Sequence, residues 1–276
     1  MKINVLFYGT CQADAILQIL NLSDDYNASW ISCKKTDLDK ESFIKKISES
    51  DIIITQSIKD NFRDVDYLST SYIIKHKKPN CKVIIFDTCH FDFYHFDTLH
   101  DREFINSINY HYTSMVECFK NGYSIDYYIN NFVNNIDLKT SEELESIAQI
   151  GLKELYRRYK RSKQLYEQNN VYPVTMYKYL KQNYKDKLLF HTKNHPSKYI
   201  LHNICEQIIQ ILQIPNTLNY DADPLSQPKS IIYKCISNNV NFDISIHHPL
   251  MKGKTEIYEI IEMYYDVYRK YGFPKV

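Results

Sequence analysis

The sequence predicts an α/β fold, in which a parallel sheet with flanking helices forms a Rossmann-like core that carries a large helical insertion. Short apolar runs rich in branched and aromatic residues alternate with stretches of helical periodicity through the first third of the chain. Such alternation is typical of βαβ units. The composition, 44% hydrophobic and 24% charged, is that of a globular protein. From the length of 276 residues we expect a single domain over residues 1–276, with the insertion at about residues 102–183.

The first predicted strand covers residues 3–8, an apolar run that stops at Gly9. The first helix covers residues 13–22, because apolar residues recur there at helical spacing. Residues 9–12 therefore form a tight turn between this strand and this helix. Further strands are expected at residues 28–33, 51–55, 82–86 and 188–191, and further helices at residues 38–47, 65–74 and 197–212.

The insertion is expected to be mainly helical, and its longest helix is expected to begin at Ser141. Apolar residues at positions 144, 148, 152 and 155 keep to one face of that helix. Ser141 gives a partial cap signature, since Leu144 occupies the position where a capping box has Glu or Gln. A run rich in Lys and Arg, residues 153–163, follows on the same helix.

Composition and charge exclude several classes of protein. The 34 Lys and Arg residues nearly balance the 33 Asp and Glu residues, whereas duplex nucleic-acid binders have a basic excess. With five glycines the chain contains no G-x-G-x-x-G dinucleotide fingerprint. No apolar run reaches the roughly 18 residues of a membrane span, and no signal peptide is recognisable. We therefore expect a cytoplasmic protein without a membrane span or a nucleic-acid partner, whose seven cysteines are reduced thiols.

The first candidate site is the turn Gly9-Thr10-Cys11-Gln12. In parallel α/β sheets, ligands bind at the carboxyl ends of the strands, where this turn is expected. Cys11 would stand at the N-terminus of a helix, whose partial positive charge favours a thiolate. The amides of the same turn could bind an oxyanion. The alternative is that Cys11 is a small residue packed at a turn.

The second candidate site is the segment Lys193-Asn194-His195-Pro196-Ser197, between a predicted strand and a predicted helix. Pro196 disfavours helical geometry at His195, which leaves the imidazole on the loop at the edge of the sheet. Ser197 could cap the following helix. A histidine at this place could be the general base that a cysteine nucleophile or an attacking hydroxyl requires, although a solvated loop histidine would look the same.

These two segments together resemble the WcbI-like polysaccharide biosynthesis family. That family has a Gly-x-Cys-Gln turn after the first strand, a strand leading to a Gln, a helical insertion, and an Asn-His-Pro segment before a helix. Here these are Gly9 to Gln12, Gln56, residues 102–183 and Asn194-His195-Pro196. The arrangement is also distantly similar to the SGNH hydrolases, with Cys11 in place of their serine and Thr192 in place of their aspartate. The resemblance covers most of residues 1–215.

The resemblance implies a cytoplasmic acyltransferase that uses acetyl-coenzyme A to O-acetylate an activated sugar or glycan precursor of a capsular or other surface polysaccharide. It implies that Cys11 is the catalytic thiol, that His195 is the base, and that Gln12 and Gln56 line the acyl or oxyanion position. Gly9, Thr10 and Asn194 would contact substrate. Two routes stay open, a thioester on Cys11 and direct attack by a sugar hydroxyl. Asp87 and Asp243 are the candidates for an acid that orients His195.

Coenzyme A carries phosphates, so basic residues are expected near its site. Lys193 is the first candidate because it adjoins His195. The second candidate is the basic run of residues 153–163, with Arg157 and Arg161, although such a run is also typical of a solvated helix face. Arg63, Lys252 and Lys254 are weaker candidates.

The loop of residues 89–100 is crowded with His, Asp and aromatic residues, including His90, His95 and His100. We expect His90 and His95 to line the sugar pocket, because aromatic rings stack on sugars and His or Asp can bind hydroxyls. A metal-dependent hydrolase is a rival interpretation, but no familiar ligand spacing such as H-E-x-x-H occurs, and no metal is expected. An SGNH-like esterase or deacylase is a further rival, and a non-catalytic glycan- or nucleotide-binding subunit is the rival that needs no catalysis.

Overall fold

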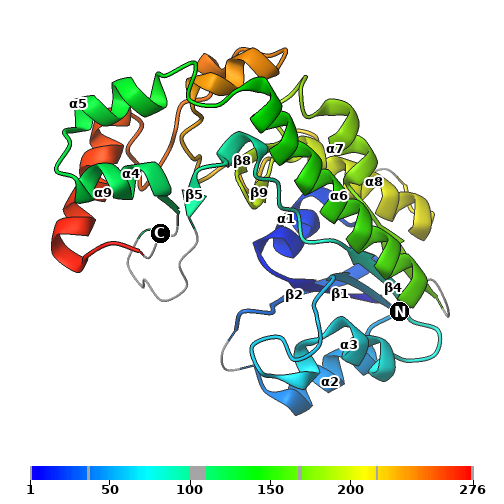
Figure 1. The fold of residues 1–276 in the computed structure, drawn as a ribbon. Helices are drawn as coiled ribbons and strands as arrows, with labels where there is room; N and C mark the ends of the chain where they lie inside the picture. The colour runs from blue at the N-terminus through cyan, green and yellow to red at the C-terminus, as the bar shows by residue number, and fades with distance from the viewer. Residues whose placement is uncertain are drawn as a thin grey trace. The chain divides into compact units, whose positions relative to one another are not determined.

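The computed structural model describes residues 2–35, 38–99, 108, 110–166, 170–215 and 217–274 (Figure 1). Residues 100–107, which include His100 and the start of the predicted insertion, lie outside the described residues. The chain divides into two compact units. The sheet unit consists of Met1–Cys89, Leu152–Gln182 and Pro196–Leu225, and the helical unit consists of His90–Gly151, Asn183–His195 and Ser226–Val276.

The sheet unit is built on a five-stranded parallel sheet with the strand order β2-β1-β3-β4-β7. The strands are β1 (Ile3–Gly9), β2 (Tyr26–Ser32), β3 (Ile52–Gln56), β4 (Lys82–Phe86) and β7 (Val171–Val174). The predicted α/β fold class is thereby confirmed, and β1 has a neighbour on each side, as expected for a buried apolar run. Trp30, the single tryptophan of the chain, lies on the edge strand β2 and is 39% exposed.

Helices cover both faces of this sheet. They are α1 (Cys11–Leu20), α2 (Lys40–Glu49), the 3₁₀ turn η1 (Asp66–Leu68), α3 (Thr70–His76), α7 (Tyr177–Asn183) and α8 (Lys198–Leu212). One face of the sheet packs against α2 and α3 in a core that joins Leu6, Ile53 and Val83 to Phe43 and Ile73. The alternate residues of the central strands point to the opposite face, where α1 and α8 lie (Figure 1).

Strand β7 is a departure from the predicted helical insertion. Residues 102–183 were expected to be mainly helical, and no strand was predicted among them, but Val171–Val174 pair in parallel with β4 and extend the sheet by one strand. The run Val-Tyr-Pro-Val has β-branched and aromatic residues, and Pro173 is tolerated because β7 is an edge strand. Because proline is rare within strands, the sequence pattern did not reveal β7.

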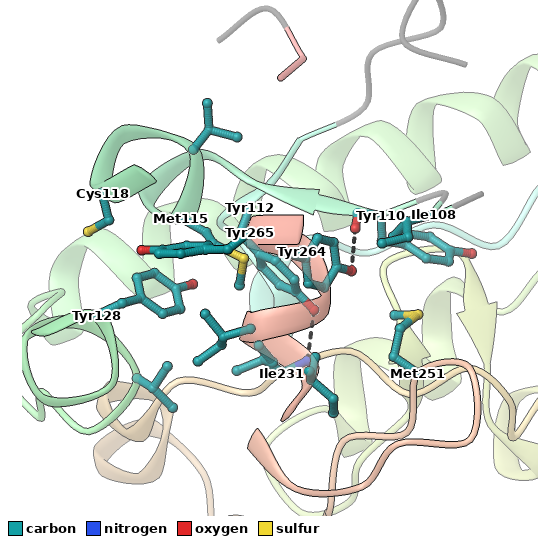
Figure 2. Close-up of a cluster of buried hydrophobic side chains, with 14 of the residues drawn as sticks. Ile108, Tyr110, Tyr112, Met115, Cys118, Tyr128, Ile231, Met251, Tyr264 and Tyr265 are labelled. Carbon is teal, nitrogen blue, oxygen red and sulfur yellow. Dashed lines mark hydrogen bonds between the residues drawn. The ribbon is translucent and has the colours of Figure 1, made fainter. Parts of the chain in front are cut away.

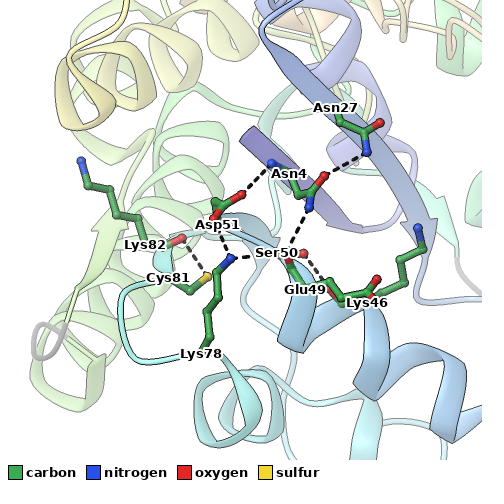
Figure 3. Close-up of polar contacts among 9 residues, drawn as sticks. All are labelled: Asn4, Asn27, Lys46, Glu49, Ser50, Asp51, Lys78, Cys81 and Lys82. Atoms are coloured by element: carbon green, nitrogen blue, oxygen red, sulfur yellow. Dashed lines mark hydrogen bonds and ion pairs between the residues drawn. The ribbon is translucent and has the colours of Figure 1, made fainter. Parts of the chain in front are cut away.

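Polar contacts tie together the amino end of the sheet (Figure 3). Asp51, just before β3, accepts hydrogen bonds from the Asn4 amide at 2.8 Å and from Lys78 Nζ at 2.5 Å. The hydrogen bonds from Lys78 and Asn4 hold the pKa of the Asp51 carboxyl below its usual value. Asn4 also accepts a hydrogen bond from Asn27 Nδ2 on β2 at 2.9 Å. These contacts hold together the amino ends of β1, β2 and β3. The candidate turn lies at the opposite, carboxyl ends of the strands.

The helical unit has a different construction, in which short elements surround an aromatic core. Its elements are η2 (Phe93–His95), β5 (Thr98–Leu99), β6 (His111–Tyr112), α4 (Thr113–Lys120), α5 (Ile125–Tyr128), the π-helical turn η3 (Ile129–Val133), the first part of α6 (Ser141–Tyr166), β8 (Phe190–Thr192), β9 (His195–Pro196, which ends in the sheet unit), η4 (Lys234–Asn239), η5 (Ile244–Ile246) and α9 (Ile257–Tyr271). Strands β5 and β6 pair antiparallel, and β8 and β9 form a second small sheet.

Tyrosine side chains dominate the core of this unit (Figure 2). Tyr264 of α9 donates its hydroxyl hydrogen to the Tyr110 carbonyl at 2.5 Å, and the Ile231 amide donates to the Tyr112 hydroxyl at 2.9 Å. Each of these buried hydroxyls is thus hydrogen bonded to the backbone of a distant segment. Residues after position 225 complete this core, although the sequence pattern predicted no helix or strand there.

A buried polar cluster lies beside the aromatic core. Asp97 accepts hydrogen bonds from the Ser114 amide at 3.2 Å and the Ser114 hydroxyl at 2.5 Å, and from the hydroxyl of Tyr233. The Tyr128 and Tyr233 hydroxyls are 2.6 Å apart. Burial raises the pKa of the Asp97 carboxyl, although the donors oppose this shift. The N-cap residue of α4, Tyr112, makes no side-chain capping hydrogen bond. Asp97, from a distant part of the chain, accepts from the first turn of α4 in its place.

Helix α6 begins with a capping box one residue earlier than the sequence indicated. The Glu143 amide donates to Thr140 Oγ1 at 3.2 Å, and Glu143 Oε2 accepts from the Thr140 amide at 2.8 Å. Thr140, and not Ser141, is therefore the cap, and the matching pattern is Thr140-x-x-Glu143.

We expect Thr140→Ala to lower the free energy of unfolding by about 1 kcal/mol, because the Glu143 amide loses its acceptor. Urea denaturation followed by far-UV circular dichroism measures this change. Ser141→Ala is the matched control and should shift the midpoint much less. A larger shift for Ser141→Ala than for Thr140→Ala would contradict the capping assignment.

Candidate functional site

The carboxyl ends of β1, β3 and β4 bring three segments together in the sheet unit. Thr10 is the N-cap of α1, its hydroxyl accepts from the Gln12 amide at 3.4 Å, and its carbonyl accepts from the Ala13 amide at 2.9 Å. This cap places Cys11 at the first position of α1. The thiol therefore stands at the N-terminus of α1, the positive end of the helix dipole.

Cys11 is exposed, and it is the only exposed cysteine of the seven, all of which the structure describes. Burial raises the pKa of the thiol in each of the other six, namely Cys33, Cys81, Cys89, Cys118, Cys205 and Cys235. The value reaches about 11 for Cys33, Cys81, Cys118 and Cys235. A reagent or substrate in solvent thus reaches one thiol, which stands at the predicted turn.

Gln12 and Gln56 form a hydrogen-bonded network beneath this turn. Gln12 Nε2 donates to the Cys89 carbonyl, and Gln12 Oε1 accepts from the Cys89 amide and from Gln56 Nε2, each at 2.9 Å. Gln56 Oε1 accepts from the Thr10 amide, and Gln56 Nε2 lies 3.5 Å from Thr88 Oγ1. Backbone amides donate to both Oε1 atoms, which fixes the orientation of both side-chain amides.

The network changes the role expected for the two glutamines. They were expected to line the acyl or oxyanion position, but their side chains are 2% and 1% exposed, and protein groups occupy their hydrogen-bonding atoms. Gln12 is therefore a positioning residue that binds the N-terminus of α1 to the segment after β4, and Gln56 binds the same turn from β3. Thr10 contributes its backbone and its cap to this arrangement.

Gly9 is required by the close approach of Gln56. A Cβ atom at Gly9 would lie 2.5 Å from Gln56 Oε1 and 2.9 Å from its Cγ, and φ of Gly9 is +154°. Neither separation is possible for a real side chain, so residue 9 can make room for Gln56 only as glycine.

We expect Gly9→Ala to displace Gln56 from the Thr10 amide and to lower the free energy of unfolding by about 1–3 kcal/mol, since a buried pair is broken. Gly122→Ala is the control, because Gly122 has φ of +70° but no atom within 4 Å of the place where an alanine methyl group would stand. It reports the backbone cost without a clash. Equal losses of unfolding free energy in the two variants would show that Gln56 does not depend on Gly9.

The segment Asn194-His195-Pro196 belongs to the strand pair β8–β9, apart from the five-stranded sheet. Asn194 Oδ1 accepts from the Tyr110 hydroxyl at 2.8 Å, and the His195 amide donates to Thr192 Oγ1 at 3.1 Å. The Tyr110 and His195 rings meet edge-on at 6.0 Å. Thr192 thus holds the backbone turn at His195.

This placement corrects one expectation drawn from the sequence. His195 was expected at the carboxyl ends of the main sheet, but the strand before it, β8, pairs with β9 and not with that sheet. A common site for Cys11 and His195 stays a prediction from the motifs. Ser197 occupies the N-cap position of α8, but its side chain makes no capping hydrogen bond.

Other predicted residues have local partners in the helical unit. Lys193 Nζ donates to the Thr98 carbonyl at 3.1 Å, and burial lowers the pKa of Lys193. Asp243 accepts from the Ser245 amide at 2.8 Å, which makes it the cap of η5. His90 Nε2 lies 3.6 Å from Asp92 Oδ1.

His95 differs from the expected pocket residue. It is 1% exposed, its Nε2 lies 3.1 Å from the Phe190 carbonyl, and burial lowers its pKa to about 4. The ring is therefore a neutral core group and not a surface that a sugar could contact. Among the described residues, no group of three or more His, Cys, Asp or Glu side chains is arranged to hold a metal ion.

The basic residues on α6 differ in how far their side chains are exposed to solvent. Arg157 and Arg161, the predicted phosphate ligands, are exposed, and the side chain of Arg157 is 62% exposed and bound to Glu154 through Nε and Nη2 at 2.7 Å. Arg158 belongs to the predicted basic run but was not named there as a phosphate ligand, and its side chain is 40% exposed. Arg158 lies three residues after the buried Leu155 and so on the same face of the helix. The apolar periodicity of α6 in the sequence could have shown that Arg158 is on this face.

Arg158 acts electrostatically on Asp87, which follows β4. Asp87 is 5% exposed, and its Oδ2 atom has no hydrogen-bond partner among the described residues. Burial raises the pKa of Asp87 to about 7, while Arg158 opposes and Glu154 adds to this shift. Asp87, Thr88 and Cys89 thus form the third segment at the carboxyl edge, two strands from Cys11 in the order β1-β3-β4.

The fold and this site define a class of α/β protein, in which a cysteine opens the first helix at the carboxyl edge of a parallel sheet. A family model described as the polysaccharide biosynthesis enzyme WcbI matches residues 4–217. The chain therefore belongs to the WcbI family of polysaccharide biosynthesis enzymes.

A solved structure of WcbI has the same fold, with a TM-score of 0.83 over 98% of this chain and 91% of that one. The two chains are 15% identical, so this likeness concerns the fold. That protein is described as a novel polysaccharide biosynthesis enzyme, in its native form without a disulfide bond between coenzyme A and one of its cysteines. No curated protein sequence matches this chain. In the described part of the chain, no helix is long and apolar enough to cross a membrane.

Proposed function

We propose that this chain transfers the acetyl group of acetyl-coenzyme A to a sugar hydroxyl of a polysaccharide precursor, and that it acts in the cytoplasm. The observation that carries this proposal is the exposure of Cys11 at the N-terminus of α1, on a turn held by buried glutamines. The description of the solved WcbI structure, which links coenzyme A with a cysteine, supports a thiol that meets this co-substrate.

We assign the thioester route to Cys11. Its thiolate attacks the acetyl carbonyl carbon, the new C–S bond forms, and coenzyme A leaves as a thiolate that takes up a proton. The sugar hydroxyl then attacks the acetyl-Cys11 carbonyl and gives its proton to a base, which restores the Cys11 thiolate. In both steps the reacting sulfur stands at the N-terminus of α1, the positive end of the helix dipole. Direct attack by the sugar hydroxyl on acetyl-coenzyme A is the alternative route.

The experiment is a short incubation of the protein with radiolabelled acetyl-coenzyme A, followed by denaturing gel analysis and by addition of capsular or surface glycan acceptors. Label on the protein that hydroxylamine removes, and that moves to a glycan, is expected. Cleavage of generic aryl esters without a need for coenzyme A would instead favour the esterase. Absence of transfer, of cleavage and of coenzyme A binding at millimolar concentration would overturn the proposal and leave a glycan- or nucleotide-binding subunit.

His195 is proposed as the base that accepts the sugar proton, a role carried by the motif Asn194-His195-Pro196. We expect His195→Gln to lower the turnover number about 100-fold or more, the scale typical of a removed general base. His191→Gln, a histidine of the neighbouring strand β8, is the comparison variant. If His195→Gln retained wild-type turnover across pH 6 to 9, the base would have to be another group.

A further inference from the structure

The sheet unit contains a cavity of about 280 Å³ beside α3, here called the α3 cavity, which the proposed acetyl transfer does not use. The loop from β3 to α3 forms its other side, and α2 lies next to α3 (Figure 1). Small-molecule sites measure about 300–1,000 Å³, so this cavity suits a ligand of one ring and not a whole coenzyme A molecule. Its lining includes the polar side chains of Asp60, Asn61, Asp66, Ser71, Tyr72 and Lys75.

Hydrogen bonds connect the lining of this cavity to the turn that carries Cys11. The Gln56 side chain accepts from the Thr10 amide, and the Gln56 carbonyl accepts from Thr70 Oγ1 at 3.1 Å. Thr70 is the first residue of α3 and precedes Ser71 of the lining. The α3 cavity and the Cys11 turn therefore lie at the same carboxyl edge of the sheet, where parallel α/β folds bind their ligands.

One carboxylate in the lining is held in place by a chain of hydroxyl groups. Ser71 Oγ donates to Asp60 Oδ1, and the Ser69 and Ser71 hydroxyl oxygens are 2.9 Å apart. Ser69 is 2% exposed and is the N-cap of α3, where its Oγ accepts from the Tyr72 amide at 3.2 Å. The Asp60 carboxylate is thus positioned before a ligand arrives, which lowers the entropy that binding costs.

Several lining side chains keep hydrogen-bonding groups that no described residue occupies. Asp60 Oδ2 is such an acceptor, and Lys75 Nζ is such a donor. The side-chain amide of Asn61 and the hydroxyl of Tyr72 can each both donate and accept. A sugar ring presents several hydroxyl groups with the same two functions, so a lining that mixes donors and acceptors matches a sugar.

The charges in the lining restrict the kind of sugar. Asp60 and Asp66 bring two carboxylates, whereas Lys75 brings one ammonium group. Lys40 Nζ of α2 lies 3.8 Å from Asp66 Oδ2 and offsets that carboxylate, which leaves Asp60 as the nearest acceptor without a cation. A carboxylate or phosphate on the ligand would be repelled by Asp60, while a hydroxyl group would donate to it. The lining therefore favours an uncharged sugar.

We propose that the α3 cavity is an acceptor subsite, which binds an uncharged sugar residue of the same glycan that is acetylated at Cys11. This inference rests on the proposed function, because it adds a second contact for the acceptor of that reaction. Asp60 accepts from a sugar hydroxyl, and Lys75 and Asn61 donate to sugar oxygens. No bond forms or breaks in this subsite, so it contributes binding of the acceptor and not chemistry.

The first test is saturation-transfer difference NMR of the full chain with the methyl glycosides of glucose, galactose and mannose, and with glucuronate. We expect saturation transfer to a neutral glycoside and much less to glucuronate, because the glucuronate carboxylate meets Asp60. Absence of transfer to every neutral glycoside, or equal transfer to glucuronate, would overturn the proposal.

Variants show whether this binding takes place in the α3 cavity. We expect Asp60→Asn to weaken glycoside binding about 10-fold or more, the scale of a lost hydrogen bond to a charged group. Asp64→Asn is the matched control, since it makes the same change of charge on the same loop outside the lining, and it should change the dissociation constant less than about twofold. Equal effects of the two variants would refute the subsite.

The second test measures acetyl transfer to a glycan acceptor. Asp60→Asn and Lys75→Gln should raise the acceptor KM about 10-fold with little change in kcat or in the KM for acetyl-coenzyme A, as for loss of uniform binding. Lys59→Gln, outside the lining, is the control for Lys75→Gln. If no acetyl is transferred but glycoside binding depends on Asp60, the sugar site stands without the transferase. If transfer occurs with an unchanged acceptor KM in both variants, the subsite is refuted and the transferase stands.

Discussion

Replacement of Cys11 by alanine is expected to reduce acetyl transfer at least about 100-fold and to abolish the labelled acetyl-protein, because the thiol that forms the thioester is gone. The fold should be unchanged, since the Cys11 side chain is exposed and the Gln12 network is held by other atoms. Transfer is measured with labelled acetyl-coenzyme A, and folding by circular dichroism.

Alkylation provides an independent measurement of the same thiol. Iodoacetamide should modify Cys11 faster than the six buried cysteines, and coenzyme A should protect it. Cys118→Ser, a change in the helical unit, is the control for loss of a thiol elsewhere. Near wild-type transfer by Cys11→Ala would exclude the thioester route, and with an unaffected His195→Gln it would exclude the whole proposed pair.

Gln12→Ala is expected to lower the free energy of unfolding by about 3 kcal/mol. The change leaves the buried amide and carbonyl of Cys89, and one N–H of Gln56, without their partner, and each such group costs about 1–3 kcal/mol before water or relaxation compensates. Urea denaturation measures the loss. Hydrogen exchange at the Cys89 amide should accelerate in the same variant.

Gln18→Ala is the matched control on the same helix. Gln18 donates to Asp14 at 2.9 Å in an exposed pair, so its removal should change unfolding free energy by less than about 0.5 kcal/mol. If Gln12→Ala and Gln18→Ala had the same urea midpoint of unfolding, the glutamine network would contribute little to the stability of the sheet unit.

The sheet unit could be predicted from sequence because its signals are local. Residues 3–8 are apolar except for Asn4, Gly9 ends this run, and helical spacing begins within a few residues. Strand β1, the turn and α1 therefore follow directly from the sequence. The same local pattern placed Cys11 at the start of a helix. Its exposure depends on which residues surround the turn, which no local pattern specifies.

The parts that could not be predicted depend on distant partners. The Ile231 amide donates to the Tyr112 hydroxyl, 119 positions away, and His111 contacts Tyr268, 157 positions away. Local periodicity does not encode these long-range contacts, so the assembly of the helical unit could not be predicted. The glutamines were recognised as site residues, but their role as positioning groups depends on Cys89, 77 positions from Gln12. Likewise β8 has strand-like residues, while its pairing with β9 is a property of the folded chain.

The distribution of aromatic residues gives each unit its own optical reporter. Trp30, on β2, is the one fluorophore that can be excited selectively, and it belongs to the sheet unit. All buried tyrosines of the described chain except Tyr8 lie in the helical unit, so ultraviolet difference absorbance on denaturation arises mainly there. Indole emission and phenol absorbance recorded in one titration therefore distinguish cooperative melting of the whole chain from sequential melting of its halves.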